Sequence, residues 1–162
     1  MVLVTVLTSV TIVGVVIGGL FAVYKNSTNL GDSQVANANL DGSAQDYVGD
    51  QEEESNADGA LINVKGFGEL TFKPNQSKQK VNFNNPSNNK CYMVFTLYMP
   101  DGSKIYESKL VEPGKAIYEI NINRSLEKGT YENARLHCSC YSMDGLLKTL
   151  NGADLKFNLK VE

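Results

Sequence analysis

Cysteine is the residue type in this chain best suited to covalent chemistry, and its three copies fall in two predicted strands. Cys91 opens one strand, and Cys138 and Cys140 lie 47 and 49 residues further along, in another. Side chains alternate between the two faces of a strand, so Cys138 and Cys140 share a face. A disulfide from Cys91 to Cys140, or else to Cys138, would stabilise the fold by roughly 3–4 kcal/mol through the loop that it closes. We favour the Cys91–Cys140 pair, and the alternative is three buried, reduced thiols.

The only histidine, His137, directly precedes Cys138. Histidine nitrogen and cysteine sulfur are preferred ligands of zinc. On an extended strand, however, His137 points away from the face that carries the two cysteines, so we expect no metal site. A catalytic triad would need a nucleophile and an acid beside the histidine, and the sequence shows no such constellation. We therefore expect a non-catalytic protein, with no catalytic residues and no cofactor.

Three tyrosines predict a contact surface for another protein. Tyr92, Tyr98 and Tyr141 are expected to face away from the core, on strands that we expect to be neighbours. Exposed aromatic side chains on a rigid sheet are typical of protein interfaces. The alternative is that they pair across strands and stabilise the solvent-facing side of the sheet. The chain has no tryptophan, which argues against a flat carbohydrate-binding platform.

The elements that must position these residues are strands, because apolar and polar side chains alternate from residue 61 onward. The clearest strand is 91–99, followed by a hairpin turn at Asp101 and Gly102. Seven or eight such strands, with turn signals at short intervals and no amphipathic helix, predict an all-β fold, an antiparallel β-sandwich over residues 61–162. The residues expected on core faces include Cys91, Met93, Phe95, Leu97, Met99, Tyr118, Ile120, Ile122, Leu136, Cys138, Cys140, Leu155, Phe157, Leu159 and Val161.

Tyr131 follows the run Leu-Glu-Lys-Gly-Thr at the start of a long predicted strand. This run resembles the tyrosine corner of immunoglobulin-like domains, in which a tyrosine hydroxyl bonds back to the backbone just upstream. In antibody domains the tyrosine lies two residues before a cysteine of the same strand. Tyr131 instead lies seven residues before Cys138. The resemblance therefore implies an immunoglobulin-like sandwich in the broad sense and not an antibody domain. The alternative is that Tyr131 only packs within its strand.

The N-terminal residues predict a transmembrane helix. Residues 2–24 run for 23 positions without a charge and are followed by Lys25. A helix of that length would be roughly 34 Å long, enough to cross a hydrocarbon core of about 30 Å. Only Met1 precedes the run and no Ala-x-Ala follows it, so we favour an uncleaved signal anchor over a cleaved signal peptide. Gly14 and Gly18 form a GxxxG pair, which predicts helix dimerisation unless it only reflects the high glycine content of membrane helices.

An acidic segment separates the predicted helix from the predicted strands. Residues 25–60 carry one Lys against eight Asp and Glu, a net charge of −7, and almost no apolar periodicity. Such a composition predicts a disordered linker. Residues 61–162 carry 14 Lys and Arg against 10 Asp and Glu, and a surplus of 4 is too dilute for a nucleic-acid footprint. Lys25 alone says little about orientation. A linker leading to a disulfide-capable β domain favours an extracytoplasmic location.

A narrower resemblance rests on the runs GFGELTF, NFNNP, NKCYMVFTLYMPDGSKIYES, LVEPGKAIYEI, GTYENA, CYSMDG and LNGADLKFNLKV. Together they resemble small, largely uncharacterised membrane-anchored surface proteins of Gram-positive bacteria, with one immunoglobulin-like domain behind a membrane helix. The resemblance spans residues 66–161 and implies a bacterial surface location, but it supplies no activity and no binding residues. Cys138 beside Cys140 departs from that group.

These features predict a single-pass protein of the cell membrane, whose extracytoplasmic β-sandwich makes protein–protein contacts at the cell surface. The expected partners are the membrane and a second protein, with no nucleic acid, and self-association is left open. The alternative function is a structural subunit of a surface filament or coat, assembled through residues 2–24.

Overall fold

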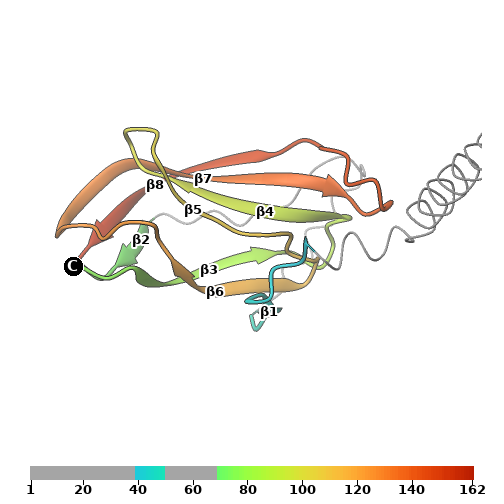
Figure 1. Ribbon diagram of the computed structural model, residues 1–162, viewed down its shortest axis with the longest axis horizontal. Helices are drawn as coiled ribbons and strands as arrows, with labels where there is room; N and C mark the ends of the chain where they lie inside the picture. The colour runs from blue at the N-terminus through green and yellow to red at the C-terminus, as the bar shows by residue number, and fades with distance from the viewer. Residues whose placement is uncertain (1–38, 50–68) are drawn as a thin grey trace, which may run out of the picture.

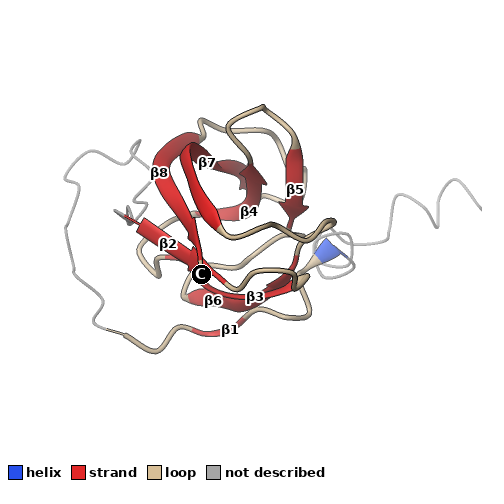
Figure 2. Cartoon of the chain, turned by 90° about the vertical axis from the view of Figure 1, so that its left-hand side faces the viewer, coloured by secondary structure: helices blue, strands red, loops and turns tan. Residues whose placement is uncertain are grey.

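The computed structural model describes residues 39–49 and 69–162, which form two β-sheets. The described strands are β1 (Gln45–Asp46), β2 (Glu69–Phe72), β3 (Lys78–Asn85), β4 (Cys91–Tyr98), β5 (Lys104–Glu107), β6 (Lys115–Asn121), β7 (Gly129–Ser142) and β8 (Ala153–Val161). One sheet has the order β1-β6-β3, and the other has the order β2-β8-β7-β4-β5 (Figure 1). Viewed along the long axis of the described part, these sheets form two layers (Figure 2). The predicted all-β, β-sandwich-like fold is confirmed for the described residues.

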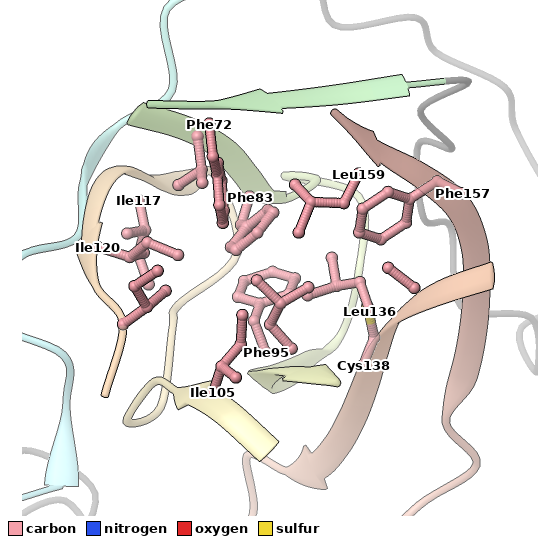
Figure 3. Close-up of a cluster of buried hydrophobic side chains, with 14 of the residues drawn as sticks. Phe72, Phe83, Phe95, Ile105, Ile117, Ile120, Leu136, Cys138, Phe157 and Leu159 are labelled. Carbon is pink, nitrogen blue, oxygen red and sulfur yellow. The ribbon is translucent and has the colours of Figure 1, made fainter. Parts of the chain in front are cut away.

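The core lies between the two sheets and is built from alternating side chains of both (Figure 3). Phe83 of β3 and Phe95 of β4 face each other across the layers, with ring centroids 5.8 Å apart. Leu136, Phe157 and Leu159 extend the same cluster along β7 and β8. Removing this apolar surface from water is the main force that holds the two sheets together.

One strand pair departs from the predicted antiparallel arrangement. β2 runs parallel to β8, with Glu69 opposite Asn158 and Phe72 opposite Val161. A two-residue hairpin can only join antiparallel strands, but β2 and β8 are separated by most of the domain, so no turn dictates their relative direction. The other pairings among the described strands are antiparallel.

The core face of β6 also differs from the prediction. Ile120 and Ile122 are buried as expected, but Tyr118 is only half-buried, and Ile117 takes its place in the core. The register between β3 and β6 shifts between Lys80 and Phe83, which places Phe83 opposite Ile117. Such an irregularity changes which residues of a strand point inward, and strict alternation cannot reveal it.

Residues 39–49 belong to the stretch predicted as a disordered linker, and for these residues that prediction is wrong. The Asp41 amide donates to the Leu110 carbonyl at 2.8 Å, and the Asn39 carbonyl accepts from the Leu110 amide at 3.0 Å. β1 then pairs with β6, and the Tyr47 amide donates to the Gly114 carbonyl at 2.9 Å. The order comes from backbone partners on distant strands, which composition cannot show. The remainder of 25–60, the predicted helix 2–24 with Gly14 and Gly18, and residues 61–68 lie outside the described residues.

Within the part of the chain that the structure describes, no helix is long and apolar enough to cross a membrane.

The two ends of the sandwich carry different parts of the chain. The C-terminus and the start of β7 share one end, where Gly129 lies opposite Val161. The β7–β8 loop, residues 143–152, lies at the opposite end (Figure 1). Asn39 lies toward that second end. Its carbonyl accepts a hydrogen bond from the Leu110 amide, and the next residue, Val111, forms a bridge with Met93 near the start of β4.

Candidate interaction surface

The structure places the three predicted tyrosines on one face of the five-stranded sheet. Tyr92 of β4 lies directly opposite Tyr141 of β7, and Tyr98 lies opposite Arg135 on the same two strands. The alternate residues of β4, such as Met93, point into the core, and Val94 and Thr96 share the face of the tyrosines. We call the solvent side of β4, β7 and β8 the outer face. The Tyr92–Tyr141 pair and Tyr98 are six residues apart along β4, or roughly 20 Å, so the tyrosines form two separate groups and not one cluster.

Tyr98 is held by a charged neighbour. The guanidinium of Arg135 lies over the Tyr98 ring, 4.5 Å from its centroid, a distance typical of a cation–π contact. The same Arg135 donates from Nη1 to both carboxylate oxygens of Asp154, at 3.2 and 3.1 Å. Both contacts restrict a side chain that would otherwise be mobile in solvent. The outer face therefore presents an aromatic ring and a cation in a fixed arrangement.

Asp154 also holds His137. His137 Nδ1 and Asp154 Oδ1 are 2.6 Å apart, and the two residues lie opposite each other in the β7–β8 pairing. Hydrogen bonds from His137 first, and then from Arg135, lower the pKa of Asp154 below its ordinary value. Because an ionised carboxylate only accepts, Nδ1 of His137 must donate to it, which fixes the tautomer and orientation of the imidazole ring.

Arg135 and Asp154 were not identified from the sequence. The alternation of 153–161 shows that Asp154 faces solvent, but it does not show which residue of β7 lies beside it. That register depends on how residues 143–152 turn, and this loop contains Leu147 with a φ of +48°, an unusual conformation for leucine. From the sequence, the partner of Asp154 could be sought only by counting residues back from the loop on both strands. Such a count is uncertain by one or two residues, and an error of one residue already gives the wrong partner.

The outer face offers complementary groups for a protein partner. Three tyrosine rings, one guanidinium, one carboxylate and one imidazole lie on a sheet whose backbone is fixed by pairing on both sides of β7. Tyrosine and arginine are the residues that most often dominate binding energy at protein interfaces. The candidate contact residues of this face are Tyr92, Tyr98, Arg135, His137, Tyr141 and Asp154.

The predicted disulfide is not formed in the structure. Cys91, Cys138 and Cys140 are free thiols, and all three are buried. Cys91 lies opposite Ser142, and Cys140 lies opposite Met93, so the two cysteines are diagonal neighbours in the sheet. Diagonal positions have Cα atoms about 7–8 Å apart, which exceeds the usual range of about 4.4–6.8 Å for a disulfide. The two thiols form a hydrogen bond instead, which is the main cause that raises the pKa of Cys140.

We expect the three thiols to be unreactive in the native chain. Burial raises the pKa of Cys138 to about 12, and none of the three side chains is more than 4% exposed. A thiolate is the reactive species, so the raised pKa slows modification of Cys138 and Cys140. The hydrogen bond with Cys140 lowers the pKa of Cys91, and burial is what keeps reagents away from that thiol. Titration with a thiol reagent should detect none of the cysteines before unfolding and all three in denaturant without reductant. Detection of a single thiol in denaturant would instead show that two cysteines are bridged.

The predicted hydrogen bond of Tyr131 is confirmed. Its hydroxyl donates to the backbone carbonyl of Glu127, four residues upstream, at 3.1 Å. Tyr131 lies near the start of β7, where the chain arrives from the other sheet. The bond ties the beginning of the longest described strand to the segment that leads into it.

Asp154 should contribute to stability in a pH-dependent way. The pKa of Asp154 is lowered in the folded chain. Its contribution to the free energy of unfolding is therefore complete above the ordinary carboxyl pKa of 3.8, and it is lost as the pH falls through the lowered pKa of the folded chain. Asp154→Asn should therefore lower the free energy of unfolding at pH 7, by less than about 1 kcal/mol because the groups are partly exposed. Denaturant unfolding from pH 7 to pH 2 measures the difference.

The matched control is Glu132→Gln, which removes the same charge from an exposed position of β7. It should leave the difference between pH 7 and pH 2 nearly unchanged. A destabilisation by Asp154→Asn that persisted at the lowest pH would contradict the electrostatic origin of the effect.

No protein-family model matches this chain, and no curated protein matches it.

Proposed function

We propose that this chain is a non-catalytic, membrane-anchored module that makes protein–protein contacts at the cell surface through its outer face. Residues 2–24 would span the membrane, and the described sandwich would lie outside the cytoplasm. The observation that carries the contact role is the arrangement of Tyr98, Arg135 and Asp154, in which an aromatic ring and a charge are oriented before any partner binds. Preorganised side chains lose less entropy on binding, which favours affinity.

We further propose that the sandwich is immunoglobulin-like. Strands B and E of that fold share one sheet, and strands C, F and G are neighbours in the other. β3 and β6 match the first pair, and β4, β7 and β8 match the second group in the same order. The Tyr131 bond near the start of β7 supports the assignment. β1 would then occupy the position beside β6 that strand D usually takes.

The contact role is tested by cross-linking in membranes. The full chain is expressed in a Gram-positive host, membranes are treated with a cross-linker, and cross-linked proteins are identified by mass spectrometry. We expect a distinct partner with the wild-type chain and its loss with Tyr98→Ala combined with Arg135→Ala. Lys80→Ala, an exposed position of β3 in the other sheet, is the matched control and should retain the partner.

Three results would contradict the proposal. Cross-links that survive the double substitution would show that the outer face is not the contact surface. Cross-links only between copies of the chain, abolished by Gly14→Leu with Gly18→Leu, would favour the structural subunit. A product found wholly in the soluble fraction, or a C-terminal tag resistant to protease on intact cells, would rule out the proposed location.

A further inference from the structure

The β7–β8 loop presents apolar side chains to solvent at one end of the sandwich. Met143 is 47% exposed, Leu146 is 62% exposed and Leu150 is 44% exposed. Among the described residues, Val48 is the only other large apolar residue whose side chain is this exposed to solvent, and it belongs to a different segment. Three such residues within eight positions form a local apolar tip, and exposed apolar patches usually mark a surface that is covered in the working protein.

The loop is held in a definite conformation. The Leu146 amide donates to Asp144 Oδ1 at 3.0 Å, and the Lys148 amide donates to Ser142 Oγ at 2.9 Å. The Leu150 amide donates to the Cys140 carbonyl at 2.8 Å. The exposed leucines are therefore displayed by an ordered loop that is joined to β7.

The position of this tip relative to the N-terminal chain suggests what covers it. Asn39 lies toward the same end of the sandwich, and only 14 residues, 25–38, separate it from the apolar run 2–24. A flexible chain of that length has an end-to-end distance of roughly 20 Å. If residues 2–24 cross the membrane, as the proposed function states, the β7–β8 end of the sandwich is the end held close to the bilayer.

The chemistry of the tip fits the boundary between lipid headgroups and acyl chains. Lys148 Nζ and Asp144 Oδ2 are 3.6 Å apart, so the charges within the loop offset each other. Tyr141 forms a bridge with Thr149 of the loop and lies opposite Tyr92. Tyrosine is enriched where proteins meet the membrane surface, because its ring is apolar and its hydroxyl is polar.

We infer that the β7–β8 loop inserts Leu146 and Leu150 into the outer surface of the membrane, as a second contact with the lipid bilayer beside the predicted span. This inference rests on the proposed membrane anchor. The contact orients the sandwich, because a tether alone leaves the domain free to tumble, whereas a tether and a loop together fix which end faces the lipid. Neutral, zwitterionic vesicles suffice for the contact, since apolar area and not charge drives it.

The absence of tryptophan in this chain allows a direct test. The full chain carrying Leu146→Trp is reconstituted in phosphatidylcholine vesicles with and without brominated acyl chains. Lys128→Trp is the matched control, because Lys128 is exposed and adjoins Gly129 at the opposite end of the sandwich. We expect Trp emission of the Leu146→Trp chain to shift to the blue and to lose most of its intensity with brominated lipid. The control should show neither change, and Leu150→Trp should behave as Leu146→Trp does.

The other outcomes separate the inference from the proposed function. A chain that floats with the vesicles but whose Leu146→Trp emission is not quenched retains its anchor and overturns the loop contact. A blue shift that brominated lipid does not quench, and that grows with the protein-to-lipid ratio, shows contact between protein copies and also overturns it. A chain that does not float with the vesicles overturns the membrane anchor and the loop contact together.

Discussion

Phe95→Ala is expected to lower the free energy of unfolding by about 3–5 kcal/mol, the usual cost of removing a buried aromatic ring. Phe95 is 1% exposed and lies on β4, between β7 and β5 in the five-stranded sheet. Its ring contacts Phe83 of the opposite sheet, so the substitution leaves a cavity where the two layers meet. Denaturant unfolding of residues 39–162, which contain the whole described core, measures the loss.

Two further variants show whether the loss comes from the cavity. Phe95→Leu should cost less, because leucine refills part of the volume. Val48→Ala, at a position that is 84% exposed, should change stability by no more than about 0.5 kcal/mol. A Phe95→Ala chain within about 1 kcal/mol of wild type would mean that the sheets do not pack through this residue.

Asn85→Ala is expected to lower the free energy of unfolding by about 2–4 kcal/mol, because it leaves buried carbonyl groups without a donor. Asn85 is fully buried, and its Nδ2 donates to the carbonyls of Cys91 and Val111, both at 2.9 Å. Its Oδ1 accepts from Asn89 Nδ2 at 2.9 Å. One side chain therefore joins the end of β3 to the start of β4 and to the segment before β6. Denaturant unfolding measures the effect.

Asn121→Ala is the control for this prediction, because Asn121 is exposed at the end of β6. It should alter stability only slightly. Unfolding midpoints that were equal for Asn85→Ala and Asn121→Ala would show that water replaces the lost donor, and the buried network would then not be structural.

Several features follow from local sequence and were predicted correctly. The alternation in 91–99 places Met93, Phe95 and Leu97 in the core, since the two-residue period of a strand needs no knowledge of its partners. The turn at Asp101 and Gly102 is present, with Gly102 at a φ of +80° that glycine adopts without strain. Tyr131 forms its predicted bond because the partner, Glu127, is only four residues away.

Other features depend on how distant strands align, and the sequence did not reveal them. His137 meets Asp154 only because of the register between β7 and β8, and Cys91 lies diagonal to Cys140 only because of the register between β4 and β7. A shift of one residue in either pairing would separate these groups, yet it would leave the composition of each strand unchanged.

The sequence by itself determined that residues 69–162 form strands with one buried face, and which residues most of those faces carry. Only the tertiary structure decided that Gln45 and Asp46 join the smaller sheet beside β6, that Ile117 and not Tyr118 enters the core, and that the outer face unites Arg135 with Asp154. The physical reason is the range of the interactions. Alternation is set by the backbone of a single strand, whereas register, sheet edges and polar clusters are set by partners that approach only when the chain has folded.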